Sequence, residues 1–235
     1  MELIFSKEAF LEGQLLLIDK PLEWTSFQLV NKIRWAIRKT YGIKKIKVGH
    51  AGTLDPLATG LMLICTGKKT KQIDQFMGLD KSYSGTFRLG ATTPSYDLET
   101  ALSDPKPIDH ISPELITKTR DCFLGKIQQK PPLHSAIKKD GKRLYTLARA
   151  GETTEISSRE ITIISYEVTP QKLPDITFLV TCSKGTYIRS LAHDFGQVLG
   201  CGAHLTSLRR TAIGTYNLDD SLTLDSFLHS LETKS

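Results

Sequence analysis

The sequence has little cysteine, and the four cysteines that it has are scattered. Cys65, Cys122, Cys182 and Cys201 form no C-x-x-C pair, and the six histidines do not pair at metal-ligand spacing. A disulfide framework and a zinc site are therefore not expected. We expect reduced thiols in a cytoplasmic protein, and no bound metal.

Long hydrophobic runs are also absent. The longest, Leu15–Ile18 and Leu61–Cys65, are strand-sized and far shorter than the roughly 20 residues of a membrane span. Glu2 and Lys7 interrupt the start of the chain, so no signal peptide is recognisable. Glycine and proline total 17 + 10 = 27 of 235 residues, and 40% of the chain is hydrophobic. This composition excludes a mainly disordered chain and allows a sizeable core.

Two motifs of common enzymes are present only in part. Thr66–Thr70 resembles the end of a Walker A loop, but Gly60 and Gly67 are separated by six residues, and Lys69 follows Lys68 directly. The motif needs four residues there, and Ser or Thr after its lysine. Ser135–Lys138 fits S-x-x-K, but its K-T-G companion is missing. Nucleotide hydrolysis and acyl transfer are therefore disfavoured.

Positive charge is concentrated in one segment, which we call the basic block. It contains Lys32, Arg34, Arg38, Lys39, Lys44, Lys45, Lys47, Lys68, Lys69 and Lys71. The only acid between Asn31 and Lys71 is Asp55, so the segment carries 10 − 1 = +9. Because the whole chain carries +6, the remainder carries 6 − 9 = −3. Such a block attracts a polyanion; a solvated lysine surface is the alternative.

Strand and helix patterns alternate without a regular βαβ rhythm, which predicts an α+β fold. A helix is expected from a cap at Thr25 or Ser26 to about Lys39. Its apolar face would hold Phe27, Val30, Ile33 and Ile37. Strands are predicted at 61–65 and 83–89, an amphipathic helix at 187–199, a basic hairpin at 138–142 and a further helix at 144–150.

The loop Gly49–Gly60 has the composition of a functional loop. Its three glycines allow unusual backbone conformations, and Pro56 pushes Asp55 away from helical dihedral angles. We expect one carboxylate, presented at a fixed angle inside positive surroundings. A simple turn or capping role for Asp55 is the alternative.

Several motifs in chain order resemble the TruB family of tRNA pseudouridine synthases. The stretch His50–Gly60, with His-Ala-Gly-Thr-Leu-Asp-Pro, looks like the family's catalytic motif. The other matching stretches are Leu16–Pro21 with Thr25-Ser26, Lys81–Gly90, Pro131–Lys138 with Gly141–Tyr145, Cys182–Arg189 and Leu205–Arg210. The resemblance covers about residues 14–218 and implies an α+β pseudouridine synthase fold, with a mixed, mainly antiparallel sheet flanked by helices and loops.

The same resemblance predicts the domain organisation. We expect a single catalytic domain over residues 1–235, with an RNA-facing insertion at about 124–152. Two departures from the family pattern are visible. His134 stands where the family usually has an aromatic residue, and only 25 residues follow Arg210. Many bacterial relatives carry a C-terminal PUA domain, and because 25 residues cannot form one, we expect that domain to be missing.

The activity implied by the resemblance is isomerisation of uridine 55, in tRNA numbering, to pseudouridine in the T loop. The glycosidic bond breaks, the uracil turns, and C5 bonds to C1′. No cofactor is implied, and we expect a monomer that binds the T arm of tRNA. Attack at C1′, addition to C6 and a glycal route all remain open.

The resemblance also implies roles for individual residues. The catalytic set would be Asp55 as the essential carboxylate, Arg189 as its ion-pair partner and Tyr83 as the aromatic that stacks on the flipped base. RNA contacts are implied for His50, Tyr187, Leu205, Lys20, Lys138 and Arg143. Without the motif, Tyr83 would be an ordinary strand aromatic and His50 a solvent-exposed loop residue.

Two other functions remain as alternatives. The chain could be a tRNA-binding folding helper whose chemistry is incidental or lost. It could also act on another RNA, or under the guidance of partner proteins. The presence of Asp55, Tyr83 and Arg189 together favours the enzyme.

Overall fold

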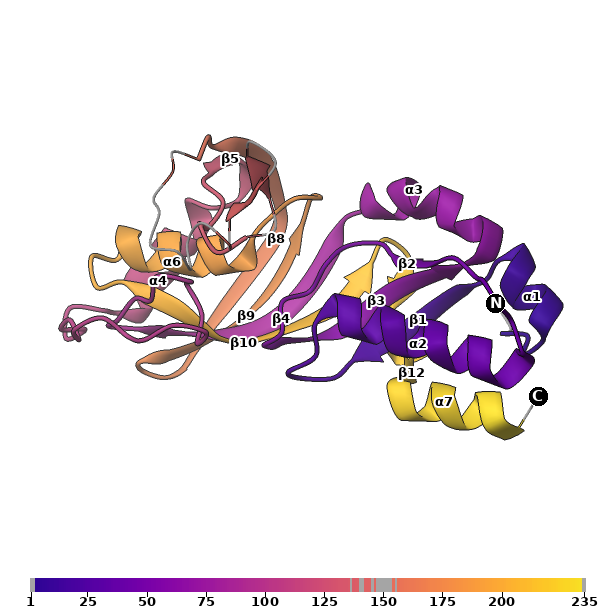
Figure 1. Ribbon diagram of the computed structural model, residues 1–235. Coiled ribbons are helices and arrows are strands. Elements are labelled where there is room, and N and C mark those ends of the chain that lie inside the picture. The colour runs from indigo at the N-terminus through magenta and orange to yellow at the C-terminus, as the bar shows by residue number, and fades with distance from the viewer. Residues whose placement is uncertain are drawn as a thin grey trace. The chain divides into compact units, whose positions relative to one another are not determined.

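The computed structural model describes residues 3–135, 137–139, 142–144, 146, 154 and 156–233. The chain divides into two compact units (Figure 1). Unit 1 comprises the chain up to Tyr83 and from Arg209 onward, and unit 2 comprises Ser84–Leu208. Strands β4 (Lys81–Leu89) and β10 (Ala203–Ile213) therefore contribute residues to both units. The single catalytic domain over 1–235 stays a prediction.

Unit 1 combines a sheet with flanking helices. Besides parts of β4 and β10, its elements are α1 (Lys7–Glu12), β1 (Leu15–Lys20), α2 (Ser26–Tyr41), β2 (Val48–His50), β3 (Ala58–Thr66), the 3-10 helix η1 (Gly67–Gln72), α3 (Ile73–Met77), β11 (Tyr216–Asn217), η2 (Leu218–Asp220), β12 (Leu222–Thr223) and α7 (Leu224–Thr233). The strand order is β12-β1-β3-β10, with β2 added to β3 and β11 to β10. The β1–β12 pair is parallel, while β1–β3, β2–β3 and β10–β11 are antiparallel.

Helix α2 begins and ends at strong local signals. The Thr25 hydroxyl accepts a hydrogen bond from the Gln28 amide, and the Gln28 side chain reaches back to the Thr25 amide, which forms a capping box. Gly42 ends the helix with φ at +61°. The predicted helix is therefore confirmed. Its predicted apolar face is wrong at Phe27, which is 70% exposed.

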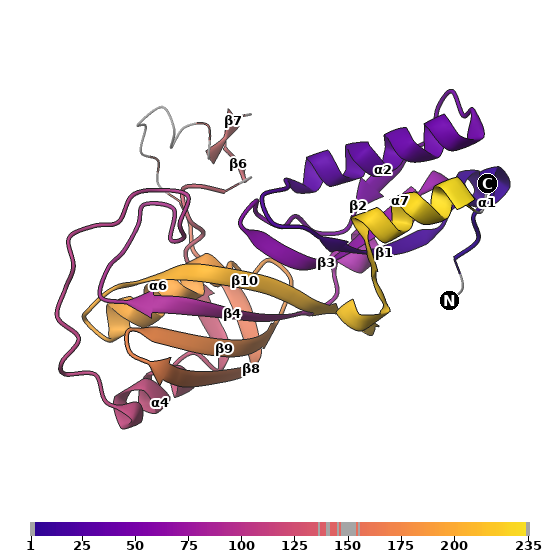
Figure 2. The same cartoon turned by 90° about the horizontal axis from the view of Figure 1, so that it is seen from below.

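Phe27 is exposed because of the helical period. At about 100° per residue, Phe27 lies about 120° around the helix from Ile33, which is fully buried. The buried positions are Ser26, Leu29, Val30, Ile33, Ala36 and Ile37. Figures 1 and 2 show α2 and α7 side by side on one face of the unit 1 sheet, with α3 on the other face.

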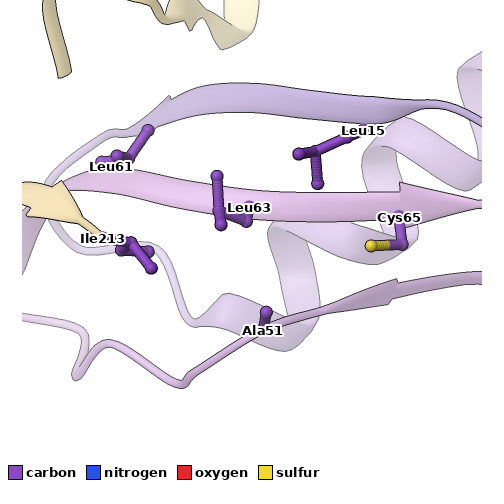
Figure 3. Packing of buried hydrophobic residues seen from close by; sticks show 6 residues of the cluster. All are labelled: Leu15, Ala51, Leu61, Leu63, Cys65 and Ile213. Carbon is purple, nitrogen blue, oxygen red and sulfur yellow. The ribbon is translucent and has the colours of Figure 1, made fainter. Parts of the chain in front are cut away.

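Strand β3 is buried on both faces and is the centre of unit 1. Leu61, Leu63 and Cys65 alternate along it, so their side chains lie on one face and pack with Leu15, Ala51 and Ile213 (Figure 3). The predicted strand 61–65 is confirmed, and it extends at both ends. Because Ala51 belongs to the loop before β3, this packing also holds the start of that loop.

Unit 2 is built on the other part of β10. Its further elements are α4 (Pro113–Asp121), β5 (Gly125–Gln129), β6 (Lys138–Lys139), β7 (Lys142–Arg143), β8 (Arg159–Lys172), β9 (Asp175–Cys182) and α6 (Ile188–Val198). The strand order is β10-β4-β9-β8-β5, and the β8–β9 and β5–β8 pairs are antiparallel. The predicted basic hairpin is present as the antiparallel pair β6–β7, while most of the helix predicted at 144–150 lies outside the described residues.

An aromatic cluster forms the core of unit 2. Phe195 on α6 contacts Phe87 with ring centroids 5.0 Å apart, Phe123 at 5.7 Å and Tyr166 at 6.1 Å. This packing confirms the amphipathic helix predicted at 187–199, and helix α4 packs beside it. The α+β class is likewise confirmed. Within the described part of the chain, no helix is long and apolar enough to cross a membrane.

Candidate active site

The loop between β2 and β3 presents Asp55 from a braced backbone. The Ala51 amide donates to the Leu63 carbonyl at 2.9 Å. The Ser26 hydroxyl, at the start of α2, donates to the Leu54 carbonyl and accepts from the Leu54 amide, both at 2.9 Å. Asp55 itself is half-buried, and its carbonyl accepts from the Ala58 amide at 3.1 Å. The residue before the carboxylate is therefore held on both its backbone groups.

Lys20 also holds this loop in place, through a hydrogen bond to the Pro56 carbonyl. Its side chain is fully buried, and Nζ donates to the carbonyls of Pro21 at 2.9 Å, Trp24 at 2.6 Å and Pro56 at 3.4 Å. Burial lowers the pKa of Lys20 to about 8; the negative charge of Asp55 opposes this shift. The predicted RNA contact of Lys20 finds no support in this burial, because the ammonium is directed at protein carbonyls.

Arg210 spans the loop from β10. It is 1% exposed; its Nε donates to the Leu61 carbonyl at 2.7 Å and its Nη2 to the Gly52 carbonyl at 3.1 Å. These two carbonyls stand on either side of Asp55 in the chain. The backbone of Arg210 also lies so close to Gly60 that a Cβ there would come within 2.6 Å of the Arg210 amide nitrogen. The structure therefore assigns Gly60 to a close approach between strands β3 and β10.

His50 and Tyr83 are the other predicted site residues of unit 1. His50, at the end of β2, is half-buried. Burial, and to a lesser extent the charge of Arg210, lower the pKa of His50, while a hydrogen bond with the Gly52 backbone acts in the opposite direction. An imidazole held neutral suits contact with a base better than with a phosphate. Tyr83 is 9% exposed, on the buried side of β4.

The remaining predicted residues belong to unit 2, where Arg189 is held from several sides. At 4% exposure, it places Nε 3.6 Å from an Asp97 carboxylate oxygen. Its Nη1 donates to the Ser95 carbonyl at 3.0 Å and its Nη2 to the His134 carbonyl at 2.9 Å. The backbone of His134 thus contributes to the position of Arg189, whatever its side chain does. The pairing of Arg189 with Asp55 stays a prediction.

Asp97, which the sequence motifs did not indicate, lies next to the predicted site residue Arg189. It is 4% exposed, and one of its carboxylate oxygens accepts from the Ser95 hydroxyl at 2.6 Å and from the Glu99 amide at 3.0 Å. Its other oxygen faces Arg189. The signal available in the sequence was the run Thr93-Pro94-Ser95-Tyr96-Asp97, where small hydroxyl residues precede an acid in a turn. That signal alone does not identify a partner far along the chain.

Tyr187 and Leu205 are also positioned within unit 2. The Gln129 side-chain amide accepts from the Tyr187 amide at 2.8 Å and donates to its carbonyl at 3.0 Å. The Arg159 guanidinium lies over the Tyr187 ring, 4.7 Å from its centroid. Leu205 is 5% exposed, and its amide donates to the Tyr96 carbonyl at 2.9 Å.

The basic block lies on the surface of unit 1. None of its ten side chains is buried: Arg38, Lys39, Lys44, Lys45, Lys47, Lys68 and Lys71 are exposed, and Lys32, Arg34 and Lys69 are partly exposed. Lys138 and Arg143 lie in the β6–β7 hairpin, and their side chains lie outside the described part. No group of three or more metal-ligand side chains is found among the described residues.

Known proteins of similar sequence share one family. The profile described as TruB family pseudouridylate synthase (N terminal domain) matches residues 38–188, and that of the tRNA pseudouridylate synthase B C-terminal domain matches 189–234. A protein of Flavobacterium johnsoniae named tRNA pseudouridine synthase B is 58% identical, over 96% of this chain and 99% of its own. One of the same name from Phocaeicola vulgatus is 54% identical, over 93% of each chain.

Solved structures show the same relationship. A chain of a Cbf5-Nop10-Gar1 complex matches with a TM-score of 0.69 and 29% identity, over 94% of this chain and 54% of its own. A chain of an H/ACA RNP bound to a substrate RNA matches with a TM-score of 0.67 and 26% identity. The present chain spans about half the length of these two chains. The class is therefore that of the pseudouridine synthases, which are isomerases. Within that class, the chain belongs to the TruB family of pseudouridylate synthases.

Proposed function

We propose that this protein isomerises uridine 55 in the T loop of tRNA to pseudouridine, with Asp55 as the catalytic carboxylate. The number of the nucleotide and the number of the residue coincide by chance. The observation that carries this proposal is the bracing of the Asp55 loop. Lys20, Ser26 and Arg210, three side chains from different parts of unit 1, hold the loop carbonyls on both sides of this one acid.

The bracing suits a reaction in which one carboxylate must meet one carbon atom. Holding a reacting group in place lowers the entropic cost of reaching the transition state. The charge of the buried Lys20 interacts with that of Asp55 and favours the ionised carboxylate, which is the form that attacks C1′, adds to C6 or assists elimination of the base. All three routes break the N1–C1′ bond and form a C5–C1′ bond, and all three release the proton of C5.

The target uridine must leave the RNA stack before Asp55 reaches it. Extrusion of a base costs a few kcal/mol, and stacking in the pocket offsets about 1–3 kcal/mol of it. We assign the stacking to Tyr83. His50 would contact the displaced T-loop bases, while Tyr187 and Leu205 would line the pocket.

The other predicted groups complete the proposal. Arg189 would orient Asp55, and the contacts with Asp97, Ser95 and His134 would hold it ready for that role. The basic block, with Lys138 and Arg143 of the hairpin, would bind phosphates of the T arm. We propose that the enzyme works as a cytoplasmic monomer without a cofactor.

Release of tritium from uridine C5 tests the reaction directly. The substrate is T-arm RNA labelled with tritium at C5, since forming the C5–C1′ bond must release the label. Asp55→Asn is expected to lower the release rate by more than about 10³-fold, near the upper range for loss of one catalytic group. Its RNA affinity should stay the same or rise slightly, because a negative charge is removed. Asp74→Asn, at an exposed acid on α3, is the matched control.

Two outcomes would overturn the proposal. If folded wild-type protein binds the RNA and releases no tritium, the tRNA-binding folding helper becomes the better function. If Asp55→Asn turns over like Asp74→Asn, the reaction stands and Asp55 is not its catalytic group.

A further inference from the structure

A hollow on the surface of unit 1 contains none of the residues proposed for catalysis, although its Lys32 belongs to the basic block. It has a volume of about 450 Å³ and is lined by the turn before α2 and the outward face of that helix (α2 is labelled in Figure 2). We call it the α2 groove; its lining residues are Glu23, Trp24, Phe27, Gln28, Asn31, Lys32 and Trp35. Both tryptophans of the chain line it.

The groove exposes aromatic rings that the fold does not use. Phe27 is 70% exposed and Trp35 is 54% exposed. Phe27, Asn31 and Trp35 are four residues apart, so they form one stripe on α2. This stripe faces away from the buried residues around Ile33. Exposed aromatic groups next to one another are typical of binding surfaces.

The surroundings of Trp35 are positively charged. Lys32 Nζ lies 5.1 Å and Lys39 Nζ 5.0 Å from the centroid of its ring. Helix α2 carries four basic residues and no acidic one, and Glu23 at the edge of the groove is the single acid in its lining. Flat rings between cations match the chemistry of an unpaired nucleotide, whose base stacks while its phosphate pairs with a lysine. An apolar protein segment would have to desolvate these ammonium groups.

The α2 groove is joined to the loop that carries Asp55. The Glu23 amide donates to the Pro56 carbonyl at 2.9 Å. The Trp24 carbonyl accepts from Lys20 Nζ at 2.6 Å, and the same ammonium reaches the Pro56 carbonyl. Glu23 of the groove is therefore hydrogen-bonded directly to Pro56, which follows Asp55, and Trp24 is hydrogen-bonded to Lys20, which also contacts Pro56.

We propose that the α2 groove binds unpaired nucleotides of the RNA substrate. Bases stack on Trp35 and Phe27, and phosphates pair with Lys32 and Lys39. This inference rests on the proposed function for the identity of the RNA as tRNA, but the stacking itself does not require the reaction. Because every base has a flat face, the groove is expected to bind without sequence preference.

Tryptophan fluorescence reports on the groove alone, since no tryptophan lies elsewhere in the chain. Titration with short single-stranded oligoadenylate is expected to quench the emission, and added salt to reverse the quenching. Trp24→Phe leaves Trp35 as the only reporter and should keep most of the quenching. Unchanged emission at an RNA concentration that saturates binding in a filter-retention assay would overturn the proposal.

Variants separate stacking from general attraction to the basic block. Trp35→Ala should raise the Kd for oligoadenylate by about fivefold or more, near the lower limit for loss of one base–aromatic stack. The double change Lys32→Gln with Lys39→Gln should weaken binding more than the control Lys68→Gln with Lys71→Gln, which removes the same charge from η1. Equal effects of the two pairs, together with an unchanged Kd for Trp35→Ala, would reduce the groove to a solvated surface.

Tritium release from tRNA distinguishes this inference from the proposed function. Trp35→Ala is expected to raise the KM for tRNA, with the lost rate recovered at saturating tRNA. If wild-type protein shows RNA-dependent quenching and no tritium release, the proposed function fails and the groove stands. If release is normal and saturating RNA leaves the emission unchanged, the groove fails and the enzyme stands.

Discussion

Removing the Arg210 side chain tests whether the catalytic loop is held as we describe. In Arg210→Met the buried Leu61 carbonyl and the part-buried Gly52 carbonyl lose their donors, at 2.7 and 3.1 Å. A buried polar group left without a partner costs about 1–3 kcal/mol of unfolding free energy, which applies to the Leu61 carbonyl; the part-buried Gly52 carbonyl adds a smaller cost. Together these costs are a large fraction of the total stability of a typical protein.

The neighbouring arginine is a matched control. Arg209 also comes from β10, but its side chain is 42% exposed and pairs with Asp19 at 2.7 Å. Because solvent screens an exposed ion pair, Arg209→Met should cost no more than about 1 kcal/mol. Urea unfolding of both variants measures the difference. Equal losses of stability would refute the assignment of Arg210 as the brace of this loop.

A second readout keeps the test independent of stability. The charge of Arg210 contributes to the lowered pKa of His50, so Arg210→Met should raise that pKa towards its ordinary value. Arg210→Lys keeps the charge and should leave the pKa of His50 low, while losing part of the hydrogen bonding. Titration of the His50 ring protons by NMR distinguishes these results, and an unchanged pKa in Arg210→Met would contradict the geometry.

Two further predictions concern the same loop. Gly60→Ala should cost about 2–6 kcal/mol of unfolding free energy, because the backbone there has φ of +104° and the new Cβ would contact the Arg210 backbone. The control Gly42→Ala, at φ of +61° in open space, should cost about 1–2 kcal/mol. Equal costs of the two variants in urea unfolding would contradict this prediction. The pKa of Lys20 is about 8 in the folded state and 10.5 ordinarily. Between these pH values the folded state therefore binds fewer protons than the unfolded state, and the cost of burying the ammonium is relieved as the pH rises. The unfolding free energy of the wild type, relative to that of Lys20→Met, should therefore rise over this range; a constant difference would exclude the lowered pKa.

Much of the local structure follows from short stretches of sequence. Thr25, Gln28 and Gly42 mark the ends of α2 because caps act within one turn of a helix. The run at Leu61–Cys65 predicts its strand, and Phe195 lies on the apolar face expected for α6. The position of Asp55 in a loop rich in glycine was equally visible, since the motif lies within a dozen neighbouring residues.

Phe27 shows where local reasoning fails. An apolar residue three positions before Val30 fits a helical face by spacing, yet the centre of the buried face is set by what packs against it. Strand β2 and helix α7 contact α2, Ile33 is fully buried, and Phe27 remains on the surface at 70% exposure. The exposed Phe27 ring lines the α2 groove, which we propose binds RNA.

The amino-acid sequence alone was sufficient for the class of fold, the family resemblance and the carboxylate that we propose for catalysis. It carried no sign that Lys20 contacts Pro56, that Arg210 contacts Gly52, or that Asp97 faces Arg189. These pairs are far apart along the chain, and their hydrogen bonds exist only after the strands have brought them together. A buried cation finds its acceptors through the packing of the whole unit, and no spacing rule along one segment encodes that partner.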